Sequence, residues 1–229
     1  MASSYLQRIP YLSRIPPIDL AGQIAPTLRI ATRTGLPALV LLLVAGIAGA
    51  LAHFDPAVFT RDLASIGHVP PYYSAISSLG ILCWAITAGL CCFAGFAVSG
   101  AARTYLLGAA ALSTLLCLDD LFMFHEGIFW PLFGIPQKVT YAAYMALVAL
   151  HVFRFRDYVL GGSWGALLLA LGLMGSSAAI DVIFSYMPRE ITATFYEDGF
   201  KFVGIAVWLG YFWSECRRAL DAKLAHETA

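Results

Sequence analysis

Three stretches of a largely apolar sequence carry the side chains that could do chemistry. They hold acidic residues with one histidine, one serine and one lysine: Asp119, Asp120, His125 and Glu126, then Ser177 and Asp181, then Glu197, Asp198 and Lys201. Carboxylates and imidazole are ligands that zinc, manganese and iron accept, and a divalent cation would let several carboxylates lie together. We therefore predict a divalent metal, bound by Asp120, His125, Asp181, Glu197 and Asp198.

The remaining residues of the set are assigned catalytic roles beside that metal: Asp119, Glu126, Ser177 and Lys201. In a helix, Asp119 and Glu126 are seven residues apart and share a face. Asp120 projects about 100° away from Asp119, so the two carboxylates cannot both point directly into one narrow site.

Spacing of four residues recurs in the other two stretches. It places Ser177 and Asp181 on one helix face, and it sets Glu197 before Lys201 in the favourable order for an ion pair. Gly204 continues the stripe of Lys201, so this face could pack closely against a neighbouring helix. A purely structural alternative stays open, in which the buried aspartates form a hydrogen-bond and ion-pair network with Lys201.

The elements that position these residues follow from composition. Hydrophobic residues make up 60% of the 229 residues, charged residues only 12%, and the mean hydropathy is +0.76. Soluble domains average about 45–50% apolar and about 25% charged residues, so this chain has too few charges for a water-facing surface. The composition predicts an all-α, polytopic membrane protein. A net charge of +0 gives no electrostatic basis for binding nucleic acid.

Six apolar stretches approach the ~20 residues that a spanning helix needs. They are residues 35–53, 77–98, 104–125, 139–155, 163–186 and 195–215. We expect a cytoplasmic or interfacial N-terminal segment over residues 1–34, a six-helix transmembrane bundle over 35–216 and a cytoplasmic tail over 217–229.

Basic residues set the expected orientation. Most lysines and arginines lie in the N-terminal segment, the even-numbered loops and the tail, which leaves Arg61, Lys138, Arg189 and Lys201 on the other side. Because basic residues near span ends favour the cytoplasm, both termini should be cytoplasmic. All three chemical stretches then lie in the outer half of the membrane, which we expect to be a bacterial inner membrane.

One resemblance bears on the chemistry. Six or seven spans with a Ser, Asp and His metal site near one membrane face are similar to the ceramidase-like membrane hydrolases, and Asp120, His125, Ser177 and Asp181 are the positions that could play those parts. The resemblance implies metal-dependent hydrolysis. Those enzymes carry a paired histidine motif in a late span, where this chain has Glu197 and Asp198.

The sequence thus favours metal-assisted hydrolysis or other modification of a lipid-like substrate that enters from the outer leaflet. The metal would lower the pKa of a bound water, and a carboxylate would act as general base. Two alternatives remain: a non-catalytic accessory or cofactor-binding subunit of a larger membrane complex, and a proton or cation transporter. The expected partners are membrane lipids, a lipid-like substrate or other membrane subunits, and no nucleic acid.

Overall fold

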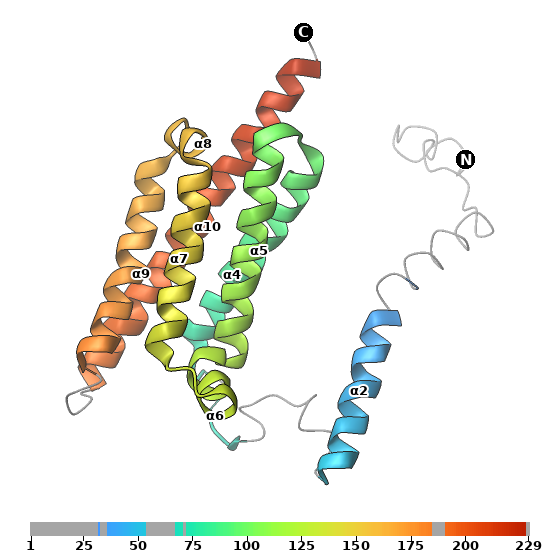
Figure 1. The fold of residues 1–229 in the computed structure, drawn as a ribbon, viewed down its shortest axis with the longest axis vertical. Coiled ribbons are helices and arrows are strands. Elements are labelled where there is room, and N and C mark those ends of the chain that lie inside the picture. The colour runs from blue at the N-terminus through green and yellow to red at the C-terminus, as the bar shows by residue number, and fades with distance from the viewer. Residues whose placement is uncertain (1–31, 33–35, 54–66, 71, 185–190, 228–229) are drawn as a thin grey trace, which may run out of the picture. The chain divides into compact units, whose positions relative to one another are not determined.

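The computed structural model describes residues 32, 36–53, 67–70, 72–184 and 191–227, and the regular secondary structure in these ranges is helical. The chain forms two compact units, Met1–Tyr73 and Ser74–Ala229. In the first unit the helix described is α2 (Leu36–Ala52). The second unit contains the residues of the predicted site, and Figure 1 shows its long helices running side by side.

The helices of the second unit follow one another through short connections. They are α4 (Ala75–Ala97), α5 (Gly100–Phe122), the π-helical turn η5 (Phe124–Ile128), α6 (Phe129–Phe133), α7 (Gln137–Arg154), α8 (Arg156–Leu160), α9 (Trp164–Phe184) and α10 (Ile191–Glu227). With α2, the five long helices of this unit overlap the six predicted stretches, although α5 ends at Phe122, three residues before the end of its stretch. The all-α class is confirmed.

Three of these helices indicate a membrane protein. By length and composition, Ala75–Ala97, Gly100–Phe122 and Trp164–Ile183 can each cross a membrane. Large apolar side chains also point outward, such as Phe93 and Phe96 on α4, which are 72% and 68% exposed. The 37-residue helix α10 is about 55 Å long at 1.5 Å per residue, well beyond a ~30 Å hydrocarbon layer. Because α10 ends at Glu227, it includes most of the cytoplasmic tail predicted over residues 217–229.

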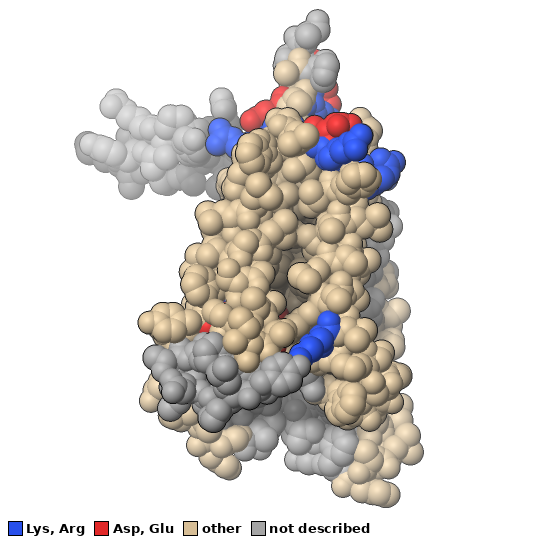
Figure 2. Space-filling model, turned by 60° about the vertical axis from the view of Figure 1, so that its left-hand side comes forward, with Lys and Arg blue, Asp and Glu red and all other residues tan. Residues whose placement is uncertain are grey.

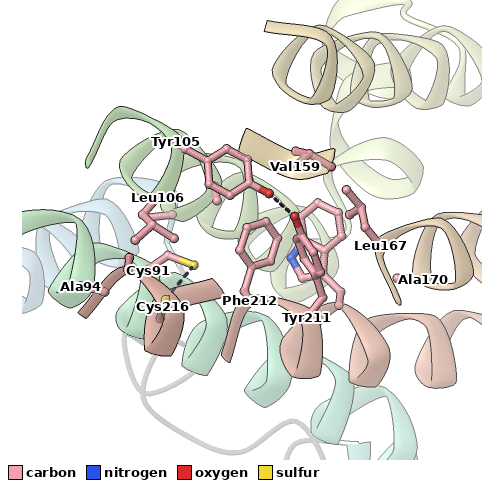
Figure 3. Packing of buried hydrophobic residues seen from close by; sticks show 14 of the residues in the cluster. Cys91, Ala94, Tyr105, Leu106, Val159, Leu167, Ala170, Tyr211, Phe212 and Cys216 are labelled. Carbon is pink, nitrogen blue, oxygen red and sulfur yellow. Dashed lines mark hydrogen bonds between the residues drawn. The ribbon is translucent and has the colours of Figure 1, made fainter. Parts of the chain in front are cut away.

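The core of the second unit lies between α4, α5, α9 and α10 (Figure 3). Trp208 of α10 packs edge-on against Trp84 of α4, with ring centroids 5.7 Å apart, and its indole N–H donates to Ser113 of α5 at 3.1 Å. The hydroxyls of Tyr105 and Tyr211 lie 2.6 Å apart. These partners satisfy the buried polar atoms of Trp208, Tyr105 and Tyr211, as buried aromatic side chains with polar groups usually require. The Tyr158 hydroxyl and His151 Nε2, beside the same core, are buried without a hydrogen-bond partner among the residues that the structure describes.

Close packing of α9 against α10 depends on Gly204, as its place in the polar stripe predicts. A Cβ atom at this position would lie 2.7 Å from Met174 Cγ and 3.1 Å from the carbonyl oxygen of Ala170. The most extensive helix contacts join α9 to α10, α4 to α5 and α4 to α10, whereas α7 makes far fewer contacts with its neighbours α5 and η5. One side of the bundle is therefore less tightly filled.

Candidate functional site

The break at the end of α5 brings His125 back onto Asp119. Helix α5 ends at Phe122, and Met123 adopts a left-handed conformation with φ 53° before η5 begins. The backbone N–H of His125 then donates to Asp119 Oδ1 at 3.1 Å, and its ring Nδ1 lies 2.5 Å from Asp119 Oδ2. Tyr144 of α7 donates its hydroxyl to Asp119 Oδ1 at 2.8 Å. Asp119 and His125 are almost fully buried.

This break corrects one expectation from the sequence. The shared face of Asp119 and Glu126 assumed a helix that continues through His125, but the chain turns at Met123, so a seven-residue helical spacing does not apply. Glu126 lies in η5, and its side chain is outside what the structure describes.

Asp120 points to a different set of partners. Its Oδ1 accepts from Lys201 Nζ of α10 at 2.6 Å, and its Oδ2 accepts from the indole N–H of Trp84 at 3.0 Å. The Lys201 side chain is 40% exposed and that of Asp120 11%. The neighbouring aspartates therefore hold separate groups, as expected from their 100° separation around the helix. The pairing of Lys201 crosses from α10 to α5.

On α9, Ser177 and Asp181 are both buried on the same side of the helix. Asp181 Oδ2 accepts from the side-chain amide of Gln137 at 3.0 Å, and the same amide lies 3.0 Å from the Tyr141 hydroxyl. These contacts link the start of α7 to the far end of α9. The carboxylate is thus held at the same level of the bundle as the residues of α5.

The α7–α9 cavity, with a volume of about 630 Å³, joins these groups. Its charged end is lined by Asp119, Asp120, His125, Ser177, Asp181, Glu197, Asp198 and Lys201. Its wall continues along Met145, Val148 and Val152 of α7 and Leu171 and Met174 of α9. Figure 2 shows a hollowed face that is almost free of charge over its middle. The Lys, Arg, Asp and Glu on this face gather chiefly at its upper end, where α8 and the end of α10 lie in Figure 1, which is opposite the charged end of the cavity.

The cavity therefore brings together eight of the nine residues singled out from the sequence. The ninth is Glu126, whose side chain the structure does not describe. Their arrangement does not form a metal site: within the described part of the chain, no three His, Cys, Asp or Glu side chains gather closely enough to hold an ion. The ligand roles of Asp120, His125, Asp181, Glu197 and Asp198 stay a prediction.

The chain matches a known protein family. Residues 35–214 match the family model described as Domain of unknown function (DUF8692). The chain belongs to this family. The matched region includes every residue that lines the cavity. No curated protein and no solved structure gives a match.

Two features of this DUF8692 chain were not predicted from the sequence. Gln137 and Tyr144 reach the aspartates from α7, although Tyr144 alone fits an interfacial aromatic belt. At the opposite end of the bundle, fully buried Glu215 pairs with Arg218, three residues along α10. The sequence signal for the Glu215–Arg218 pair is the i, i+3 spacing of opposite charges. The same spacing also fits an exposed pair in a cytoplasmic tail, so it does not predict that Glu215 is buried.

Proposed function

We propose that this protein is an integral membrane enzyme that binds a lipid-like molecule in the α7–α9 cavity and modifies its head group by acid–base chemistry. The main observation behind this proposal is the polarity of the cavity, which has charged side chains at one end and an apolar wall along α7 and α9. Its volume of about 630 Å³ lies within the ~300–1,000 Å³ of ordinary small-molecule sites. An amphiphile matches both parts of the cavity, because its polar head suits the charged end and its apolar chain suits the apolar wall.

The catalytic role rests on Asp119 and His125. A carboxylate that holds Nδ1 fixes the ring orientation and the tautomer, and it assigns proton exchange with a substrate to Nε2. The 2.5 Å contact between Asp119 and His125 Nδ1 supports this role. In hydrolysis, His125 would take a proton from the attacking water and return it to the leaving group. Lys201 and Ser177 line the same cavity and are placed to bind the head.

A divalent metal has no part in this mechanism. Asp119 is already shared between His125 and Tyr144, and Lys201 compensates the charge of Asp120. Asp181 likewise accepts from Gln137, so these three aspartates are each engaged by other side chains of the protein. We keep zinc, manganese or iron as a sequence-based hypothesis and derive no step through it.

The proposal includes six spans with both termini in the cytoplasm, which puts the charged end in the outer half of the membrane. The even number of long helices among the residues that the structure describes, and the distribution of lysine and arginine, support this topology. The test uses a protein without its native cysteines, with a single cysteine placed at Gly67, Ser4 or Thr228. In intact cells, an impermeant thiol reagent should label the cysteine at Gly67 and leave those at Ser4 and Thr228 unlabelled. Labelling at Ser4 from outside would reverse the topology.

Entry of substrate from the lipid is the route we favour. Helix α7 makes only modest contacts within the bundle, and the cavity lies along the faces of α7 and α9. A lipid-like molecule would pass between these two helices with its head toward Asp120 and Lys201.

The test is product formation by the whole protein in lipid vesicles. Amphiphiles with amide, ester and phosphoester linkages would be supplied separately, and products identified by mass spectrometry. We expect one linkage to be cleaved or altered, with loss of product in His125→Gln. The matched control is Leu150→Trp on the exposed side of α7, which should keep the activity.

Two outcomes would overturn the enzymatic proposal. Equal product formation by His125→Gln would remove His125 from the chemistry. Tight binding of amphiphiles without product from any linkage would instead support the accessory or cofactor-binding subunit. Movement of protons or cations across vesicles, abolished by Lys201→Met, would support the transporter.

A further inference from the structure

We infer that α7 measures the apolar chain of the bound amphiphile, so that the cavity selects substrates by chain length. This inference rests on the proposed function, because it assumes that the head of the molecule lies at the charged end. It adds a specificity that the head-group chemistry does not contain. The residues that would set this length are Val148, Val152 and Phe153.

The first observation is that the cavity follows one stripe of α7. Its lining residues on this helix recur every three or four positions: Tyr141, Tyr144, Met145, Val148, Ala149, Val152 and Phe153. Such spacing keeps them on one face of the helix. The cavity is therefore an elongated groove parallel to α7 rather than a rounded chamber.

Polarity changes along this groove in a single direction. At the start of α7, Tyr144 contacts Asp119 and Tyr141 contacts the Gln137 amide that binds Asp181. From Met145 onward the α7 lining is apolar up to Phe153. A head group at the carboxylates would thus direct an attached chain toward the other end of α7.

The far end of the groove has a boundary. Arg156 and Phe153 both line the cavity there, and the Arg156 guanidinium lies over the Phe153 ring at 5.4 Å from its centroid. A charged group at this point ends the apolar surface that a chain could cover. The groove is thus limited by the head site at one end and by Phe153 with Arg156 at the other.

The distance between these limits predicts a chain length. Met145 and Phe153 are eight residues apart, which is about 12 Å along a helix. An extended chain advances about 1.2 Å per bond, so the apolar part holds about ten carbons. Methylene groups within the groove should each raise affinity about four-fold, whereas groups beyond it should add little.

Substitution along the stripe would move this limit. Val152→Trp fills the groove near its far end, and Val148→Trp fills it four residues, or about 6 Å, closer to the head. The two variants should differ by about five carbons in the longest chain that still gains affinity. Phe153→Ala should act in the opposite direction by opening the far end. Leu150→Trp, on the exposed side of the same helix, is the matched control.

The experiment is displacement of a fluorescent amphiphile from whole protein in amphipol by linear n-alkyl phosphocholines, from hexyl to hexadecyl. Wild type and Leu150→Trp should show affinity that rises to about decyl and then levels off. The break should come earlier in Val152→Trp and earliest in Val148→Trp, and later in Phe153→Ala. Melting temperatures measured in parallel identify any variant that fails to fold.

Failure of this inference is distinct from failure of the proposed function. If the probes bind but affinity rises at the same rate through hexadecyl in every folded variant, or levels off at one length in all of them, α7 does not measure the chain. If no probe displaces the fluorescent amphiphile from wild type, the cavity is not an amphiphile site and the proposed function itself is wrong.

Discussion

Two carboxylate–cation pairs occupy opposite ends of the same bundle, and they differ in what surrounds them. Asp120 and Lys201 face the α7–α9 cavity; we call them the outer pair, after the topology proposed above. Glu215 and Arg218, the inner pair, lie beside the turn between α8 and α9, where Glu215 is fully buried. The chemistry of the two pairs is alike, so the difference lies in how completely the chain itself satisfies each one.

The chain encloses the inner pair. The backbone N–H of Ser163 donates to Glu215 Oε1 at 3.1 Å, and Arg218 donates to the Tyr158 carbonyl at 3.2 Å with its guanidinium 4.2 Å from the Tyr158 ring centroid. Burial lowers the pKa of Arg218 but the Glu215 carboxylate raises it, and the net direction is upward. Fully satisfied in this way, the pair ties the α8–α9 turn to α10.

The outer pair has a cavity on one side in place of such an enclosure. Asp120 is held by Lys201 and Trp84, yet both members of the pair line a volume of about 630 Å³ that the chain does not fill. Burial of charge is therefore not by itself a sign of function in this bundle. Charge placed beside unfilled space is the stronger sign.

The largest expected effect is on the inner pair. Arg218→Met leaves the fully buried Glu215 carboxylate uncompensated. Breaking a buried pair typically costs about 3–5 kcal/mol, and we expect the low end, about 3 kcal/mol, because the Arg218 side chain is itself 38% exposed. The free energy of unfolding should fall by that amount in equilibrium denaturation, while amphiphile affinity of the folded protein should stay unchanged. Arg217→Met is the control, because its 3.7 Å pair with Asp221 is exposed and should contribute about 0–1 kcal/mol.

An intermediate effect is expected at the turn beside the inner pair. A Cβ atom on Gly162 would collide with the Glu215 carboxylate, whereas one on Gly165 would meet nothing within 4 Å. Gly162→Ala should therefore destabilise by about 1–3 kcal/mol, the usual cost of forcing extra atoms into a packed region. Gly165→Ala should not destabilise. Thermal unfolding of the two variants side by side would measure this, and equal melting temperatures would show that the turn is loosely held.

The smallest effect is expected at the outer pair. Lys201→Met removes a hydrogen-bonded partner of Asp120, but the lysine is 40% exposed and the cavity leaves room for another partner. The loss should be about 1 kcal/mol, near the net worth of one hydrogen bond. Chelator should leave the melting curve of wild type unchanged. A fall in melting temperature with chelator would restore the divalent metal predicted from the sequence.

Periodicity and composition were sufficient to predict the helices, because apolar runs of this length have few alternatives in a membrane. They also indicated which polar residues share a level of the bundle. They could not predict the turn at Met123, since a left-handed non-glycine residue has no strong sequence signal. An ion pair of Lys201 with the buried aspartates was one alternative from the sequence, but the sequence could not select Asp120 among them, because local spacing points to Glu197 and the observed contact depends on the packing of α5 against α10.

We expect a ligand to bind in the α7–α9 cavity and not at the inner pair. Photo-crosslinking of the whole protein in vesicles with a diazirine-bearing single-chain amphiphile tests it directly. We predict adducts on the cavity-lining peptides of α7 and α9, around Met145 and Met174, that excess unlabelled amphiphile suppresses. Adducts that ignore the competitor and are spread over lipid-exposed positions such as Phe93 and Phe96 of α4 would contradict the account.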